Sequence, residues 1–213
     1  MKKRLKSIIL CHIFLPFQAL AQMHTDDMNY WIEKYQSVSY PLKSIHISSS
    51  YGKRADPFTG KGRFHQGIDL EAKYEVVFAM FDAEIKRVGY DPMSGNFITL
   101  KAGNYTISYC HLSEIWVKED ELVYAGQEVG RSGSTGRATG PHLHISCRLH
   151  GKIENPYHLL TFVRDTQLKA VDALGLNKDI KLSPEDFLRT YAPQAMHQQR
   201  KYGIPASVIL SQM

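Results

Sequence analysis

The 213-residue sequence is poor in several features that would point to familiar protein classes. It has three cysteines, which are too few for a small fold held together by several disulfides. No basic stripe with interleaved aromatic residues runs along it, so no nucleic-acid partner is expected. Strand and helix patterns do not alternate, which argues against a doubly wound parallel sheet. Its glycine-rich stretch lacks the G-K-[ST] ending of a phosphate-binding loop.

The first 21 residues, MKKRLKSIILCHIFLPFQALA, have the order of a secretory signal peptide: a basic run, an apolar stretch and the small-x-small site Ala19–Ala21. The apolar stretch is short and Pro16 interrupts it, so we expect no stable membrane anchor after cleavage. Bulky Leu10 before Cys11 disfavours lipid attachment. The sequence therefore predicts an exported protein, periplasmic or extracellular.

Removal of this leader changes the meaning of the charge. The formal net charge is +5, from 26 basic and 21 acidic residues. The leader holds no acid and four basic residues, so 26 minus 4 leaves 22 basic residues against 21 acids, a net +1. The remaining 213 minus 21, or 192, residues suffice for one medium-sized domain with an extension. The basic character belongs to the leader and identifies no partner.

Short apolar or alternating segments between Ile45 and Ile153, separated by Gly, Pro, Asn and Asp, predict a mainly antiparallel β domain. Helices are predicted before it at Asp26–Gln36 and after it at residues 166–175, with a third from Pro184 to Arg200. The predicted division is a signal peptide (1–21), a helical lead-in (22–44), the β domain (45–162), a linker with helix (163–182) and a helical extension (183–213).

Imidazole and carboxylate side chains occur at spacings that suit a metal. His142 and His144 would lie on one face of a strand, because residues i and i+2 point the same way. His65 and Asp69 stand four apart around Gly67, in a segment whose pattern is not helical. Three such ligands with one position left open make a catalytic zinc site. For H-x-H alone, two polar residues on a solvated strand face are the alternative.

His111 ends an apolar strand in the segment YCHLSEI. Imidazole titrates near neutrality, so a histidine that binds no metal can give or take a proton during amide hydrolysis. The sequence has no H-E-x-x-H helix, and the glutamate base of that metalloprotease class is therefore missing. If any side chain serves as the base, it must be a histidine.

Three motifs in order, HQGID (65–69), YCHLS (109–113) and GRSGSTGRATGPHLH (130–144), resemble the lysostaphin-type and LytM-type zinc metallopeptidases, which cut peptidoglycan cross-links. The resemblance covers about Ile45 to Pro156. It implies a LytM-like β-sheet peptidase domain. It also implies one Zn²⁺ held by His65, Asp69 and His144, with His111 and His142 acting in catalysis. One of these two would accept a proton and the other would stabilise the oxyanion, and the sequence leaves open which does which.

The resemblance implies an exported zinc metalloendopeptidase that hydrolyses peptide cross-links of bacterial peptidoglycan. A non-catalytic activator of wall amidases with the same fold is the main alternative, although such proteins typically lack the metal ligands that this chain retains. A peptidase acting on other glycine-rich or secreted proteins is a third. The scissile bond is not fixed by the sequence.

Residues around these motifs carry weaker expectations. The glycine-rich loop Gly130–Gly140 would let the backbone approach a substrate peptide closely. Arg54 and Arg137 could meet substrate carboxylates, but surface ion pairs are the default for both and are preferred for Arg137. Glu71 could lean toward the metal, but an exposed strand carboxylate is preferred.

Cys110 and Cys147 could form one disulfide or stay as two small buried residues, and the sequence does not decide between these. Cys110 adjoins His111, and Cys147 lies three residues from His144. Strict strand alternation would therefore place both cysteines on the sheet face away from the histidines.

The tail from about Pro184 to Met213 resembles the opening helices of bacterial glucosaminidase domains, in which a Tyr-Gly-Ile-Pro-Ala-Ser segment precedes the catalytic glutamate. That glutamate would fall just beyond Met213. The resemblance therefore implies a truncated domain start that cannot cleave glycans.

Overall fold

The computed structural model describes residues 27–174. These divide into two compact units: residues 36–166 form the larger one, and residues 27–35 and 167–174 belong to the other. The expected signal peptide (1–21) and the glucosaminidase-like tail (183–213) lie outside the described residues. Within residues 27–174, no helix combines the length and apolar character needed to span a membrane.

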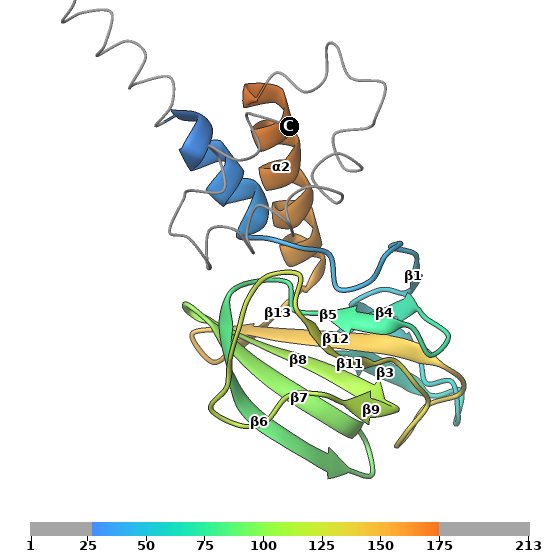
Figure 1. The fold of residues 1–213 in the computed structure, drawn as a ribbon. Coiled ribbons are helices and arrows are strands. Elements are labelled where there is room, and N and C mark those ends of the chain that lie inside the picture. The colour runs from blue at the N-terminus through green and yellow to red at the C-terminus, as the bar shows by residue number, and fades with distance from the viewer. Residues whose placement is uncertain (1–26, 175–213) are drawn as a thin grey trace, which may run out of the picture. The chain divides into compact units, whose positions relative to one another are not determined.

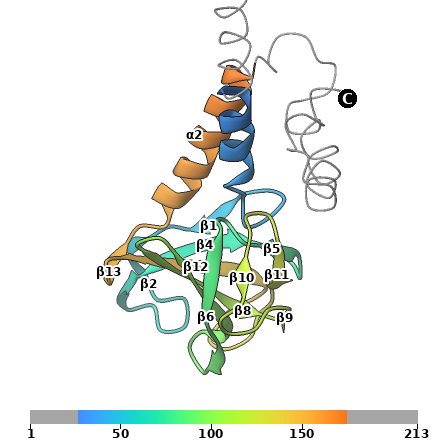
Figure 2. The same cartoon turned by 60° about the vertical axis from the view of Figure 1, so that its left-hand side comes forward.

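The larger unit is built on an eight-stranded sheet in which segments far apart in the sequence lie side by side (Figure 1). The strand order is β1-β4-β12-β8-β7-β6-β10, with β13 paired to β12 off this path. Figure 2 shows β10 beside β6 at one edge. The strands are β1 (Ile47–Ser49), β4 (Gly67–Glu71), β6 (Ala83–Asp91), β7 (Gly95–Ala102), β8 (Tyr105–Leu112), β10 (Leu122–Val123), β12 (His142–Leu149) and β13 (Lys152–Glu154).

Two smaller sheets complete the β structure. β11 (Glu128–Arg131) lies between β5 (Val76–Phe78) and β9 (Glu114–Ile115), and β2 (Gly52–Ala55) forms a hairpin with β3 (Gly62–His65). Every described strand pair is antiparallel. The predicted fold class, mainly antiparallel β with a helical extension, is confirmed.

The large sheet buries one face because its strands alternate. On β12 the side chains of Leu143, Ile145 and Cys147 are buried in the core, whereas His144 and Ser146 between them are only partly buried. Neighbouring strands add buried residues from the same face, among them Leu70 and Tyr109, whose hydroxyl accepts a hydrogen bond from the Met80 amide (3.2 Å). The alternation therefore leaves the other face of β12 for polar side chains.

A β-bulge interrupts β8 near its end. Asn96 pairs with Leu112 and Ile98 with Tyr109, so β8 holds one residue more than β7 over this stretch. His111 lies in the bulge with φ at +63°, a conformation that few non-glycine residues adopt. The bulge breaks the strand alternation at this point and sets the direction of the His111 side chain.

Two of the three predicted helices fall within residues 27–174 and are present there, one with a different boundary, whereas the helix predicted from Pro184 to Arg200 lies outside the described residues. A helix spans residues 27–36, within one residue of the prediction. The helix expected at residues 166–175 is the second half of α2 (Tyr157–Ala173). α2 begins earlier because the Asn155 side chain accepts a hydrogen bond from the Tyr157 amide (3.0 Å), and Pro156 directly precedes the helix. The prediction used Asn155-Pro156 only as a break.

Leu143 offers a test of how the core supports the polar face. Its side chain is fully buried between His142 and His144 in sequence, so Leu143→Ala should lower the free energy of unfolding by about 2–5 kcal/mol. Urea denaturation of metal-free protein would measure this. Arg148→Ala, at an exposed position of the same strand, is the control and should change it by less than about 0.5 kcal/mol. Equal losses in both variants would contradict the described packing.

Candidate active site

Strand register brings the first two candidate ligands together. Asp69 on β4 and His144 on β12 are direct cross-strand partners, so their side chains leave the sheet on the same face. The two strands are consecutive in the sheet although the residues are 75 positions apart in sequence. His65 ends β3, just before β4, and its ring lies 5.0 Å from that of His144, centroid to centroid.

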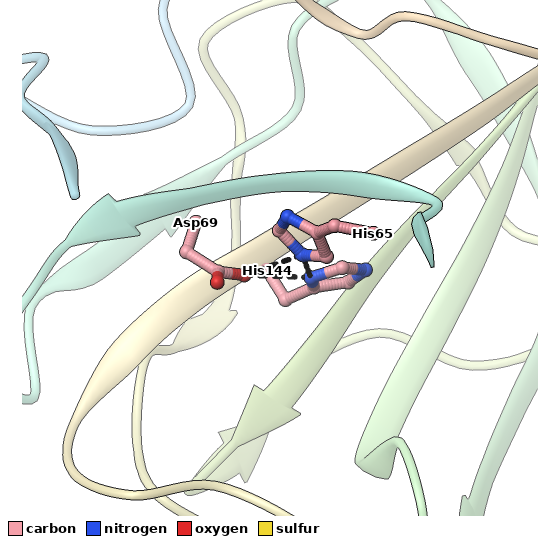
Figure 3. A group of neighbouring side chains, drawn as sticks. All are labelled: His65, Asp69 and His144. Carbon is pink, nitrogen blue, oxygen red and sulfur yellow. Dashed lines mark hydrogen bonds and ion pairs between the residues drawn. The ribbon is translucent and has the colours of Figure 1, made fainter. Parts of the chain in front are cut away.

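The three side chains aim one atom each at a common point (Figure 3). Nδ1 of His144 lies 2.7 Å from Oδ1 of Asp69, and Nε2 of His65 lies 3.2 Å from the same oxygen. The two ring nitrogens are 3.1 Å apart. Among the described residues this is the one group of three or more His, Cys, Asp or Glu side chains whose ligand atoms lie this close together.

This donor set fits zinc. Two imidazole nitrogens and one carboxylate oxygen are common zinc ligands, and they leave a fourth position open. In a tetrahedral site with bonds of about 2.0–2.1 Å, ligand atoms are separated by roughly 3.3 Å. The observed separations of 2.7, 3.1 and 3.2 Å are slightly shorter, so small side-chain movements would accommodate the ion.

Outer contacts orient these side chains. Nδ1 of His65 lies 2.9 Å from the Ser50 carbonyl oxygen. Because a carbonyl oxygen only accepts hydrogen bonds, Nδ1 must be the donor, and Nε2 is left free to bind a metal. Arg54 donates from Nη1 to Oδ2 of Asp69 (3.2 Å), the oxygen that faces away from the two histidines. Arg54 thus pairs with Asp69, and it also donates to the Ser49 hydroxyl (2.6 Å).

The protonation states suit metal binding. Burial acts to raise the pKa of Asp69, but its close contacts with His144 and His65 outweigh this effect and hold that pKa far below its usual range. Burial lowers the pKa of His144, which favours the neutral ring that metals bind. Asp69 is therefore ionised and His144 neutral at neutral pH.

His111 and His142 lie beside this group without joining it. Their ring centroids are 4.7 Å apart, and the His111 ring lies 5.9 Å from that of His144. Each holds its Nδ1 at 2.8 Å from a backbone carbonyl, of Thr135 for His111 and of Gly140 for His142. In each neutral ring the proton is therefore on Nδ1, and Nε2 carries a free lone pair. For His142 this atom lies 3.7 Å from Oδ1 of Asp69.

Burial also lowers the pKa of His111 to about 4, and the hydrogen bond to Thr135 compensates only in part. His111 is consequently neutral at neutral pH and able to accept a proton. The unfolded chain, with an ordinary histidine pKa near 6.5, binds more protons between pH 6.5 and 4. The contribution of His111 to stability is therefore lost as the pH falls through this window.

Thr135 is a positioning residue that the sequence did not single out. Its carbonyl receives His111 Nδ1, its hydroxyl donates to the Leu112 carbonyl (2.8 Å), and the same hydroxyl accepts from the Asn96 amide (2.9 Å). This close packing needs Gly95, because a Cβ there would lie 2.3–2.4 Å from Thr135 atoms. Gly95 lies outside the loop Gly130–Gly140, whose expected approach to a substrate peptide stays a prediction.

All five candidate residues line one cleft of about 720 Å³. The glycine-rich loop contributes Arg137 to Pro141 to its wall, and the β2–β3 hairpin contributes Asp56 to Phe58. Arg137 forms an ion pair with Asp56 (2.9 Å), which is the kind of contact expected for it from the sequence. Glu71 is exposed, as preferred, and lies outside the three-residue group.

The cysteines differ from one expectation. Both are free and buried, so of the two alternatives the structure has separate thiols. Cys147 packs in the core on the face away from His144, as expected. Cys110 is instead the direct cross-strand partner of His144, so its expected placement away from the histidines is wrong. The reason is the bulge, which lets Cys110 and His111 both face the cleft.

Comparison with known proteins identifies this arrangement. Residues 63–156 match the family model described as Peptidase family M23. The chain contains a peptidase family M23 domain. All five candidate residues fall inside the matched range.

Proteins similar to the M23 domain carry the names of peptidases. Peptidoglycan DD-endopeptidase ShyC of Vibrio cholerae is 35% identical over 119 residues, which are 54% of this chain and 28% of that protein. A zinc-containing peptidase from Vibrio cholerae superimposes with a TM-score of 0.52 and 32% identity, over 56% of this chain and 39% of that one. The chain spans 26% to 33% of the length of curated relatives such as ShyC.

The similarity extends to a solved structure that consists of a catalytic domain alone. The catalytic domain of lysostaphin from Staphylococcus simulans superimposes with a TM-score of 0.50 and 30% identity. The match covers 55% of this chain and 92% of that domain. The shared unit therefore spans nearly the whole of that neighbour's catalytic domain.

Gly67 provides a test of the three-residue group that leaves its members intact. A Cβ at this position would lie 2.6 Å from the His144 ring and 2.3 Å from the Ile145 carbonyl oxygen. Gly67→Ala should displace His144 and reduce zinc affinity by about 10- to 100-fold, the usual cost of lost ligand orientation. Titration with a competing zinc chelator would measure it.

Gly62→Ala is the matched control, because a Cβ there meets nothing within 4 Å. It should bind zinc as the wild type does. A folded Gly67→Ala protein with unchanged zinc affinity would show that the metal is held elsewhere.

Proposed function

We propose that the chain is a zinc metalloendopeptidase that hydrolyses peptide cross-links of bacterial peptidoglycan. The observation that carries the proposal is the convergence of His65, Asp69 and His144, with Nε2 of two further histidines left free in the same cleft. The names of two relatives support the substrate class, because ShyC and ShyA of Vibrio cholerae are named peptidoglycan DD-endopeptidases.

His65, Asp69 and His144 would hold one zinc ion, which when bound supplies a Lewis acid and lowers the pKa of a coordinated water from about 15.7 toward 7. The role of the protein is to fix the ligands. Ser50 and Arg54 hold His65 and Asp69 in their orientations, so little reorganisation is needed when substrate arrives.

His111 and His142 would supply the proton transfers. Nε2 of each is the free atom, since Nδ1 is tied to a backbone carbonyl of the glycine-rich loop. The neutral ring of His111 can take a proton from the attacking water and pass it to the leaving amine. The second ring, once protonated, can donate to the oxygen of the cleaved carbonyl. Assignment of the two roles could equally be reversed.

The alternative of a non-catalytic amidase activator has less support. A regulator needs the fold and a binding surface, but it has no use for five histidine and aspartate side chains in one cleft. A general protease would share this chemistry and differ only in substrate preference. Cross-linked wall peptides and an unrelated glycine-rich peptide as substrates would separate these functions.

We also propose a place and a domain order for the enzyme. Residues 1–21 would direct export to the cell envelope or beyond, where peptidoglycan lies, and residues 45–162 would be the peptidase domain. Residues 22–44, 163–182 and 183–213 would be a lead-in, a linker with helix and a glucosaminidase-like segment. The relatives that act on peptidoglycan support an envelope location.

Four alanine variants would test the proposal on purified cross-linked muropeptides. His65→Ala and Asp69→Ala should lose bound zinc and cleavage together. His111→Ala and His142→Ala should keep zinc and lose about 10²- to 10⁴-fold in turnover, the range for lost proton transfer. A chelator should abolish wild-type cleavage, and added zinc should restore it.

His46→Ala is the control, because His46 is exposed and does not line the cleft. It should behave as the wild type. Zinc-free His111→Ala protein would count against the division into ligands and proton carriers, and cleavage that survives metal removal would refute a metallopeptidase.

A further inference from the structure

A cluster of opposite charges lies in the cleft wall and is not used by the chemistry proposed above. Asp56, the first residue of the turn between β2 and β3, is buried at 5% exposure. Its Oδ1 accepts hydrogen bonds from the amides of Phe58 and Thr59, both at 3.0 Å. The backbone of the turn therefore orients the carboxylate independently of its other contacts.

Two arginines from distant segments meet this carboxylate. Arg63 of β3 donates to Oδ2 (2.9 Å), and Arg137 of the glycine-rich loop donates from Nη2 to both oxygens (2.9 and 3.2 Å). The Arg63 hydrogen bond and the other donors hold the pKa of Asp56 far below its usual range, so the carboxylate is ionised. One negative charge is thus shared by two positive charges.

The carboxylate has no capacity for more donors. A carboxylate offers about four lone-pair positions, and Asp56 already accepts from two amides, the Thr59 hydroxyl and both guanidinium groups. The remaining N–H groups of the arginines must find other acceptors.

Arg137 is held rigidly with donors to spare. Its guanidinium lies 4.3 Å from the centroid of the Phe58 ring, and its amide donates to the Met93 carbonyl (3.1 Å). Its Nε is buried and has no hydrogen-bond partner among the described residues. The side chain as a whole stays 33% exposed and lines the cleft, so its N–H groups outside the contact with Asp56 are open to a ligand oxygen.

We propose that Arg137, held by Asp56 and Phe58 and assisted by Arg63, recognises a carboxylate of the substrate peptide in the same cleft as the metal-binding group. The inference rests on the proposed function and deepens it. The planar fork of arginine matches the two oxygens of a carboxylate, and the excess positive charge of the cluster favours an anion over a neutral amide. Arg137 is thus a specificity-determining residue.

Three substrates test it: a cross-linked wall peptide with all carboxylates free, the same peptide with its side-chain carboxylates converted to amides, and the same peptide with only its C-terminal carboxylate converted. Zinc-loaded full-length wild type should lose about 10- to 100-fold in kcat/KM on one of the two amides, mainly through KM. The amide affected identifies which carboxylate is bound.

Arg137→Gln should bring the ratio of kcat/KM for the free and amidated peptides close to one. Arg137→Lys keeps the charge but not the fork, so it should retain only part of the ratio. It also gives a result if the glutamine variant does not fold, which a thermal melt would show. Arg131→Gln is the matched control: Arg131 also pairs with a carboxylate and stacks on an aromatic ring, but does not line the cleft. It should keep the wild-type ratio.

Wild type that cleaves free and amidated peptides equally well would overturn this inference while leaving the proposed function in place. So would an Arg137→Lys protein with the full wild-type ratio. Wild type that cleaves none of the three peptides would overturn the proposed function, and the inference with it.

Discussion

The site depends on the pairing of β4 with β12. Asp69 and His144 can share an ion only because they are direct cross-strand partners on the polar face of the sheet. A shift of the register by one residue would turn one of them into the core and expose a leucine or isoleucine in its place. The buried side chains of Ile68, Leu70 and Leu143 on the opposite face fix the register, so the apolar core determines the geometry of the polar site.

Two of the other histidines, His65 and His111, depend on departures from regular strand geometry. His65 comes from a hairpin that precedes β4, and His111 from a bulge with a positive φ. Both rings are oriented through Nδ1 by backbone carbonyls, of Ser50 and Thr135, which do not change when side chains are exchanged during evolution or mutagenesis. The regular sheet holds Asp69 and His144 in place, and the irregular positions set the directions of the His65 and His111 rings.

The sequence predicted much of this because periodicity and spacing are local signals. Alternation located the long strands, and the i, i+2 spacing of His142 and His144 placed both on one face. The bulge could not be predicted, because one extra residue in β8 is visible only once its partner strand is known. Strict alternation therefore misplaced Cys110. Asp56 was overlooked for a similar reason, since Arg137 lies 81 residues away in sequence.

The cleft combines two kinds of recognition in one fold. One part gathers imidazole rings around an ionised aspartate, and another holds two guanidinium groups on a single buried carboxylate, Asp56. The glycine-rich loop serves both, because it carries the Thr135 carbonyl that orients His111 and the Arg137 side chain.

His65, Asp69 and His144 are expected to bind one zinc ion and to leave one coordination position open. A crystal structure of the zinc-loaded protein, with anomalous data collected at the zinc edge, tests it most directly. The account predicts one peak bonded to Nε2 of His65, Nδ1 of His144 and a carboxylate oxygen of Asp69, with a non-protein fourth ligand. A peak bound by a cysteine sulfur, or one closed by four protein ligands, would contradict it.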